Sequence, residues 1–101
     1  MNQTPLPLTL YGGNDCDDTE RAVGLLNALG IAYRQISIDE DPEAERFVIF
    51  INNGNRSTPT LVFGQERLKL VLTEPSDEEL VAAIFEAGHL AQGDQEAFPL
   101  D

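Results

Sequence analysis

The stretch Tyr11–Thr19, YGGNDCDDT, joins a strand-like run to a predicted helix and carries the only cysteine of the chain, Cys16. The preceding residues Leu6–Tyr11 (LPLTLY) alternate apolar and polar side chains, as in a half-buried β-strand, and Gly12 and Gly13 end that strand. The start of a helix stabilises negative charge and so favours the thiolate form of a cysteine. The stretch therefore predicts a strand-to-helix junction with a candidate nucleophile.

Three helices are predicted from apolar side chains that recur with helical spacing. The first ends at Gly30, the second is capped by Asp41 with Pro42 in its first turn, and the third has the capping-box pair Ser76 and Glu79. The buried stripes expected for these helices are, in chain order, Ala22, Leu25, Leu26 and Leu29; Ala44, Phe47, Val48 and Ile51; and Leu80, Val81 and Ile84.

Three further strands are expected at Ile31–Ile38, Thr60–Phe63 and Leu68–Leu72, the last two joined by a turn around Gly64 and Gln65. The element order is then βαβ followed by ββα. A βαβ unit makes its two strands parallel, and a tight turn makes the last two antiparallel. The sequence therefore predicts an α/β fold with a four-stranded mixed sheet and helices on both faces.

The length of 101 residues predicts a single domain, residues 1–101, with a core at about 6–87. The last segment, Gly88–Asp101, has two glycines, a proline and few apolar residues, so it is expected to be a loosely held extension in which His89 is solvated.

Composition excludes several classes of partner and site. The net charge is −12 with only six Lys and Arg residues, which argues against nucleic acid and anionic membranes as partners. A single cysteine and a single histidine exclude an internal disulfide framework and leave a mononuclear metal site poorly supplied, so no metal site is predicted. A free thiol and the lack of a long apolar segment favour the cytoplasm, and the chain is expected to be a monomer.

Three segments in this order resemble the glutaredoxin family: LTLYGGNDCDDT at the first strand-to-helix junction, GNRSTPT before the third strand, and TEPSDEEL ahead of the last helix. The resemblance covers about Leu6–Ala87 and is strongest to the small bacterial glutaredoxin-like proteins that include the mycoredoxins. It implies a thioredoxin-like fold and thiol–disulfide exchange.

The resemblance gives Cys16 the role of the nucleophile and places Thr19 where the family has the second cysteine of its C-x-x-C motif. The chain is thus a monothiol variant with the motif CDDT. A cysteine without a second thiol can attack a mixed disulfide and is then released by a small thiol.

The resemblance also implies the binding residues. Pro59 matches a proline that the family holds in the cis form beside the nucleophile, and Thr58 matches the residue whose backbone pairs with the cysteinyl part of a bound thiol. Ser76 and Asp77 match the helix start that holds the γ-glutamyl end of glutathione, and Arg56 lies where a basic residue can meet a carboxylate of that ligand.

The three aspartates around the thiol, Asp15, Asp17 and Asp18, depart from the family pattern and oppose a thiolate. A helix N-terminus stabilises an anion by about 0.3–1 kcal/mol. Each carboxylate at about 7 Å costs the thiolate roughly 0.6 kcal/mol in water and about 2.4 at an effective dielectric of 20. The Thr19 hydroxyl can donate a hydrogen bond to the thiolate. We therefore expect the pKa of Cys16 to lie nearer that of an ordinary thiol than those of strongly activated cysteines.

The predicted function is a monothiol glutaredoxin-like thiol–disulfide oxidoreductase that reduces mixed disulfides between proteins and a low-molecular-weight thiol. No permanently bound cofactor is expected, and glutathione or a similar thiol is the expected co-substrate. Two alternatives stay open at this point. One is a redox-inactive binding module with the same fold, and the other is a dimeric carrier of an iron–sulfur cluster in which two Cys16 side chains and two glutathione thiols supply the ligands.

Overall fold

The computed structural model describes residues 6–64 and 70–89. Every helix and strand expected from the sequence is present among them; the third strand has the predicted bounds, and the bounds of the other three strands differ from the prediction by one to three residues. In chain order the elements are β1 (Leu8–Gly12), α1 (Asp17–Ala28), β2 (Arg34–Ser37), α2 (Pro42–Ile51), β3 (Thr60–Phe63), β4 (Leu70–Thr73) and α3 (Asp77–Glu86). The predicted turn at Gln65 and the predicted start of the last strand at Leu68 lie outside the described residues.

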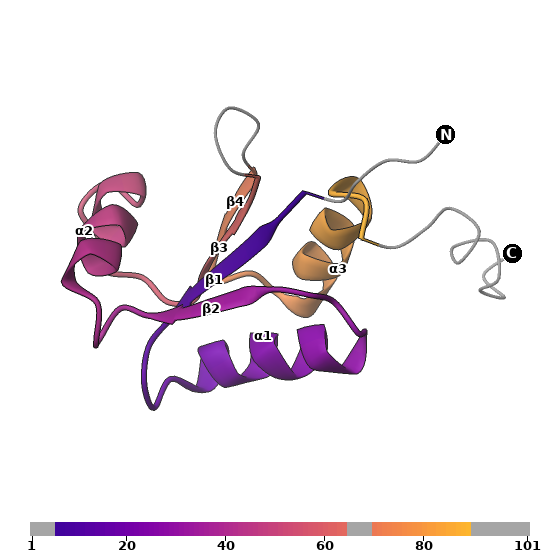
Figure 1. Cartoon of the computed structure of the whole chain (residues 1–101), viewed down its shortest axis with the longest axis horizontal. Coiled ribbons are helices and arrows are strands. Elements are labelled where there is room, and N and C mark those ends of the chain that lie inside the picture. The colour runs from indigo at the N-terminus through magenta and orange to yellow at the C-terminus, as the bar shows by residue number, and fades with distance from the viewer. Residues whose placement is uncertain (1–5, 65–69, 90–101) are drawn as a thin grey trace, which may run out of the picture.

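The four strands form one sheet in the order β2-β1-β3-β4. β1 is parallel to β2, with Tyr11 opposite Ile36, and antiparallel to β3, with Tyr11 opposite Thr60. β3 and β4 are antiparallel, as expected for a hairpin. The fold is therefore the α/β fold with a mixed sheet that the sequence predicts, and β1 lies in its interior (Figure 1).

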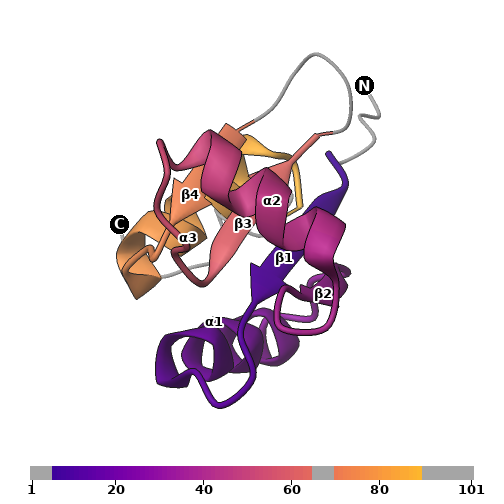
Figure 2. The ribbon, with the colours of Figure 1, turned by 90° about the vertical axis from the view of Figure 1, so that its left-hand side faces the viewer.

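Helices cover both faces of the sheet. α1 and α3 pack together on one face, and α2 covers the other, where it faces the viewer in Figure 2. The larger core lies under α1 and α3 and the smaller one under α2; their buried members are Leu8, Leu10, Ala22, Leu26, Ile31, Leu61, Phe63, Leu80, Ala83, Ile84 and Ala87 in the first, and Ile38, Ala44 and Val48 in the second. Burial of these apolar side chains is the main stabilising contribution to such a fold.

The helix starts agree with the predicted caps. The Asp41 side chain accepts hydrogen bonds from the backbone N–H groups of Glu43 and Ala44, and both bonds of the Ser76–Glu79 capping box are present. One predicted core residue is misplaced, since Leu29 is 37% exposed. It lies at the C-cap of α1, beyond the last full turn that contacts the sheet.

The two ends of the described core are joined by hydrogen bonds. The Leu6 N–H donates to the Ala87 carbonyl at 2.9 Å, and His89 Nε2 lies 2.6 Å from the Leu6 carbonyl oxygen. The His89 ring also meets the edge of Phe63, with 6.0 Å between the ring centroids. The expectation of a solvated His89 is therefore wrong, because a backbone acceptor and an aromatic neighbour hold it. The rest of the predicted extension, residues 90–101, lies outside the described part of the chain.

Candidate active site

Cys16 is the N-cap residue of α1, where its carbonyl accepts the first helical hydrogen bond from the Glu20 N–H at 3.0 Å. Its side chain does not cap the helix and is half-buried. The thiol therefore lies at the positive end of the α1 dipole and is free to act on a neighbour.

The neighbour across from the thiol is Thr58. Cys16 Sγ lies 3.4 Å from the Thr58 hydroxyl oxygen, and the thiol can also donate to the Thr58 carbonyl at 3.9 Å. The Thr58–Pro59 peptide bond is cis, as the resemblance implied, and Pro59 is buried. The Pro59 carbonyl accepts from the Glu74 N–H at 2.8 Å, which connects the cis-proline segment to the residues that lead into α3.

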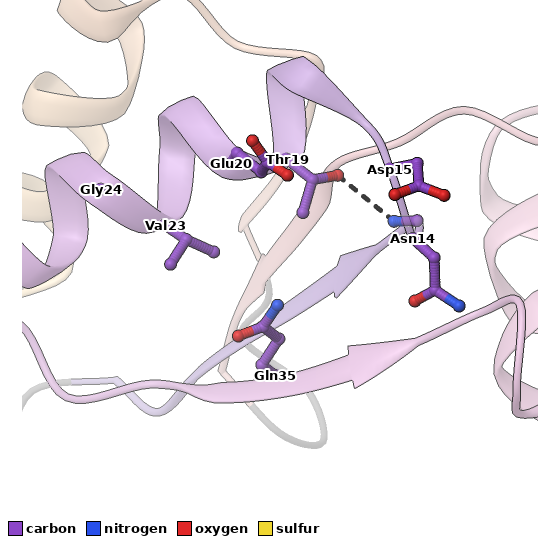
Figure 3. Close-up of a pocket in the computed structure, with 8 residues that line it drawn as sticks. Asn14, Asp15, Thr19, Glu20, Val23, Gly24 and Gln35 are labelled. Atoms are coloured by element: carbon purple, nitrogen blue, oxygen red, sulfur yellow. Dashed lines mark hydrogen bonds between the residues drawn. The ribbon is translucent and has the colours of Figure 1, made fainter.

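Thr19 fills the space where a second cysteine of the motif would stand, and it is almost fully buried, at 3% exposure. Its hydroxyl oxygen accepts from the Gly13 N–H at 3.3 Å (Figure 3). The fit is close, because a methyl group on Gly12 would lie 2.5 Å from Thr19 Cγ2. Glycine at this position therefore lets β1 end directly against the Thr19 side chain.

Hydrogen bonding lowers the pKa of Cys16 from its ordinary value. The hydroxyl of Thr19 contributes most and that of Thr58 next, because both stabilise the thiolate, while partial burial opposes them. The aspartates Asp15, Asp17 and Asp18 have exposed side chains. The closest hydroxyl with a described contact to the sulfur is that of Thr58, so the hydrogen bond from Thr19 and the size of the pKa change stay predictions for titration.

The start of α3 is connected to α1 by an arginine that the sequence analysis did not single out. Arg21 Nη1 donates to Asp77 at 3.0 Å, while Nη2 donates to Asp18 at 3.3 Å and to the Pro75 carbonyl at 3.5 Å. Arg21 lies in the N-terminal half of α1, so its contacts connect the start of α3 to the end of α1 at which Cys16 is the N-cap. The spacing of Asp18 and Arg21, three residues apart in a helix, is the signal from which part of this cluster could have been found.

Arg56 has a different environment from the one expected of a ligand-binding cation. Its guanidinium pairs with Asp39, just after β2, and with Glu45 of α2. An anionic ligand would have to compete with both carboxylates for this side chain. Whether Arg56 contacts a ligand stays a prediction.

A hollow of about 420 Å³ lies on the β2 side of α1. Figure 3 shows Gln35 of β2 pointing toward Val23 of α1, with Asp15 and Glu20 at the rim. Its lining combines two carboxylates, the side-chain amides of Asn14 and Gln35, and the apolar side chain of Val23. None of the predicted binding residues lines it, so the predicted ligand groove at Thr58 and Ser76 is a separate surface.

Two further results concern only residues 6–64 and 70–89. They contain no group of three or more His, Cys, Asp or Glu side chains placed to hold a metal ion. No helix in this part of the chain has the length and apolar character needed to cross a membrane.

A comparison with known proteins matches the part of the chain that carries Cys16 and cis-Pro59. The glutaredoxin family model matches residues 8–68, from β1 through the cis-proline and β3. The chain belongs to the glutaredoxin family. This glutaredoxin is 35% identical over 77 residues to a Mycobacterium tuberculosis protein named as a glutaredoxin in strains CDC 1551 and H37Rv, covering 76% of this chain and 88% of that one.

Solved structures of similar proteins share the fold. The glutaredoxin of Archaeoglobus fulgidus is 25% identical with a TM-score of 0.62, over 78% of this chain and 86% of that chain. The thioredoxin-like protein BC3987 has the same TM-score at 22% identity, over 74% of this chain and 96% of that chain. The thioredoxin-like architecture is therefore shared by this glutaredoxin and both structures.

Proposed function

We propose that this chain is a monothiol thiol–disulfide oxidoreductase that reduces mixed disulfides between proteins and glutathione or a similar small thiol. The observation that carries the proposal is the Cys16 thiol at the α1 N-terminus, 3.4 Å from the Thr58 hydroxyl and next to cis-Pro59. A half-buried thiol with a lowered pKa in such a position suits nucleophilic attack on sulfur.

The reaction needs only one protein thiol. The Cys16 thiolate attacks the small-thiol sulfur of the mixed disulfide, and the substrate protein leaves as a thiolate that takes a proton from solvent. A second small thiol, deprotonated, then attacks the same sulfur in the Cys16 mixed disulfide. The small thiol leaves as its own disulfide and Cys16 returns as the thiolate, so the two electrons come from the small thiols and no resident cofactor is required.

The ligand is proposed to lie along Thr58 and the start of α3. Within residues 6–64 and 70–89 no acceptor is found for the Thr58 N–H, which leaves it open to pair with the cysteinyl part of a bound thiol. A γ-glutamyl carboxylate suits the N-terminus of α3 at Ser76 and Asp77. Arg21 supplies the positive charge there, since it contacts Asp77 and Pro75. Arg56, the cation predicted from sequence, is the weaker candidate because its partner Asp39 also holds the Asn14 backbone, so a ligand that took Arg56 would disturb the active-site loop.

The test is turnover of a glutathione mixed disulfide formed from hydroxyethyl disulfide, coupled to glutathione reductase and followed as consumption of NADPH. The wild-type protein is expected to turn over and Cys16→Ser to lose activity completely. Absence of turnover in a wild-type protein whose thiol still alkylates would defeat the oxidoreductase and favour a binding module. A brown protein after anaerobic purification, dimeric on gel filtration, would favour the iron–sulfur carrier instead of the proposed cytoplasmic monomer.

A further inference from the structure

The loop that carries the nucleophile, Gly13–Cys16, is held from the side of β2 and α2. The Asn14 N–H donates to Asp39 Oδ2 at 2.6 Å, and the Asn14 side chain bonds Glu40 at 3.2 Å and Ser37 at 2.9 Å. The segment 37–40, which begins at the last residue of β2, therefore fixes both the backbone and the side chain of Asn14, two residues before Cys16.

The Asp39 carboxylate uses its two oxygens for two different partners. Oδ2 accepts from Asn14, and Oδ1 pairs with Arg56, which is held in turn by Glu45 of α2. Arg56 and the Asn14 N–H together keep the pKa of Asp39 below its ordinary value. Asp39 is thus an ionised acceptor that is held by Arg56, which Glu45 of α2 holds in turn.

The loop contacts Thr19 and lies beside Thr58. A methyl group on Gly13 would lie 3.4 Å from Thr58 Oγ1, 3.6 Å from Asp39 Oδ2 and 3.6 Å from Cys16 Cβ, so these three side chains converge on Gly13. The Gly13 N–H donates to Thr19 Oγ1 at 3.3 Å. The same loop faces Thr58, whose hydroxyl oxygen lies 3.4 Å from Cys16 Sγ and can donate to the thiolate.

We propose that Asp39 is a positioning residue for the Cys16 nucleophile: held by Arg56, it fixes the Asn14 backbone and thereby keeps the Cys16 sulfur beside the Thr58 hydroxyl. The proposal rests on the proposed function, in which this sulfur is the attacking atom. It concerns a residue that no comparison and no sequence motif assigned to the site.

A direct electrostatic role of Asp39 predicts the opposite result from a positioning role. A nearby carboxylate opposes a thiolate, so removal of its charge alone should lower the pKa of Cys16. Loss of the contact between the sulfur and the Thr58 hydroxyl should raise the pKa. The other charged groups around the loop stay unchanged in both cases; they are Asp15, Asp17, Asp18, Arg21, Glu40, Glu45 and Arg56.

The experiment measures alkylation of Cys16 by iodoacetamide, a neutral reagent, as a function of pH. Asp39→Ala is expected to raise the pKa of Cys16 by about 0.5–1 unit, which slows alkylation at neutral pH roughly three- to tenfold. Asp39→Asn keeps one acceptor oxygen for the Asn14 N–H while weakening the pair with Arg56, so it should raise the pKa less than Asp39→Ala does. An unchanged or lowered pKa in Asp39→Ala would overturn the proposal.

Two further variants test the route through Thr58 and the specificity of the site. In Thr58→Val the pKa should already be raised, and adding Asp39→Ala should produce little further change, whereas an additive rise would contradict the positioning role. Glu40→Ala removes a carboxylate that contacts only the Asn14 side chain and should not raise the pKa. If Asp39→Ala does not fold, Asp39→Ser replaces it with the same expected sign.

Alkylation separates this proposal from the proposed function, because it requires no turnover. A protein that fails to turn over mixed disulfides but shows the Asp39→Ala rise would defeat the oxidoreductase alone. A protein that turns over normally while Asp39→Ala leaves the pKa unchanged would defeat the positioning role alone.

Discussion

Two arginines lie on opposite flanks of the nucleophile, and each bridges two carboxylates. Arg21 joins Asp18 to Asp77, and Arg56 joins Asp39 to Glu45. Both arginine side chains are 43% exposed, so neither pair gains much from burial. In composition and exposure the two clusters are nearly the same.

They differ in what the carboxylates hold. Asp39 also accepts from the backbone N–H of Asn14, so the Arg56 cluster fixes the main chain of the active-site loop. The Arg21 cluster links only side chains and the Pro75 carbonyl at the start of α3. An ion pair that holds backbone sets geometry, whereas one between exposed side chains can exchange partners when an anionic ligand arrives. We therefore expect the two clusters to differ in function because of where they lie and not because of their charge.

The largest effect, a loss of stability, is expected at Gly12, where the active-site loop leaves β1. Gly12→Ala places a methyl group 2.5 Å from Thr19 Cγ2 and should destabilise the protein by about 1–3 kcal/mol through overpacking. Urea unfolding followed by circular dichroism measures it.

Gly24→Ala is the matched control for that substitution. Among the described residues, a methyl group on Gly24, inside α1, would meet nothing within 4 Å beyond its chain neighbours and the helix's own backbone, so this change should stabilise the helix by about 0.5–1 kcal/mol. Equal unfolding midpoints for the two variants would show that the contact between Gly12 and Thr19 is not close.

The next effect separates the two arginines directly. Arg21→Gln should raise the KM for a glutathione mixed disulfide about three- to tenfold with little change in kcat, because it removes a charge-assisted contact at the α3 start. Arg56→Gln should instead raise the pKa of Cys16 and lower the rate at neutral pH with little change in KM. If Arg56→Gln instead raised the KM and Arg21→Gln did not, the ligand carboxylate would bind Arg56, as predicted from the sequence.

A smaller effect is expected at the cap of α3. Ser76→Ala removes the hydroxyl that accepts from the Glu79 N–H and should cost about 1 kcal/mol of stability. Glu79→Gln preserves the capping-box geometry and should cost less. Alkylation of Cys16 should be unchanged in both variants, and a slowed alkylation would mean that the two flanks are not independent.

The smallest effect is a pH dependence of stability at Asp39. Its pKa is lowered in the folded state, so its ion pair contributes stability above about pH 4, the ordinary range of aspartate, and loses that contribution as pH falls through the folded pKa. The stability difference between wild type and Asp39→Asn should therefore be constant from pH 7 to about 5 and shrink below about pH 4. Urea midpoints across this range measure it; a difference that persists to pH 2.5 would show that the ion pair contributes nothing to folding.

Much of the fold was predictable because local signals agreed with one another. The stripe at Ala44 and Val48, the Asp41 cap and the Ser76–Glu79 capping box each specify a helix without reference to the rest of the chain. Strand bounds were less accurate, since β2 begins at Arg34 and not at Ile31. Ile31 is buried in the core without belonging to the strand, and composition does not separate these two roles.

The site was predictable only in part. The position of Cys16 beside Thr58 followed from a family resemblance, because no local pattern brings together two residues that are 42 positions apart. The contacts of Asn14 with Asp39 and of Arg21 with Asp77 span 25 and 56 positions, and carboxylates on an acidic surface give no sign of which ones are paired. These contacts require the folded arrangement of β2, α1 and α3.

The hydrogen bonds that join Leu6 to Ala87 and His89 have a consequence for engineering. They bring the two limits of the described core together at the start of β1, while Cys16 follows its end, a strand length of about 17 Å away. A short linker between Leu6 and His89 would therefore join the two ends of the core, and the chain could be cut at another loop to give new termini. Such a circular permutant is expected to keep the thiol chemistry intact, because no bond around Cys16 crosses the closed junction.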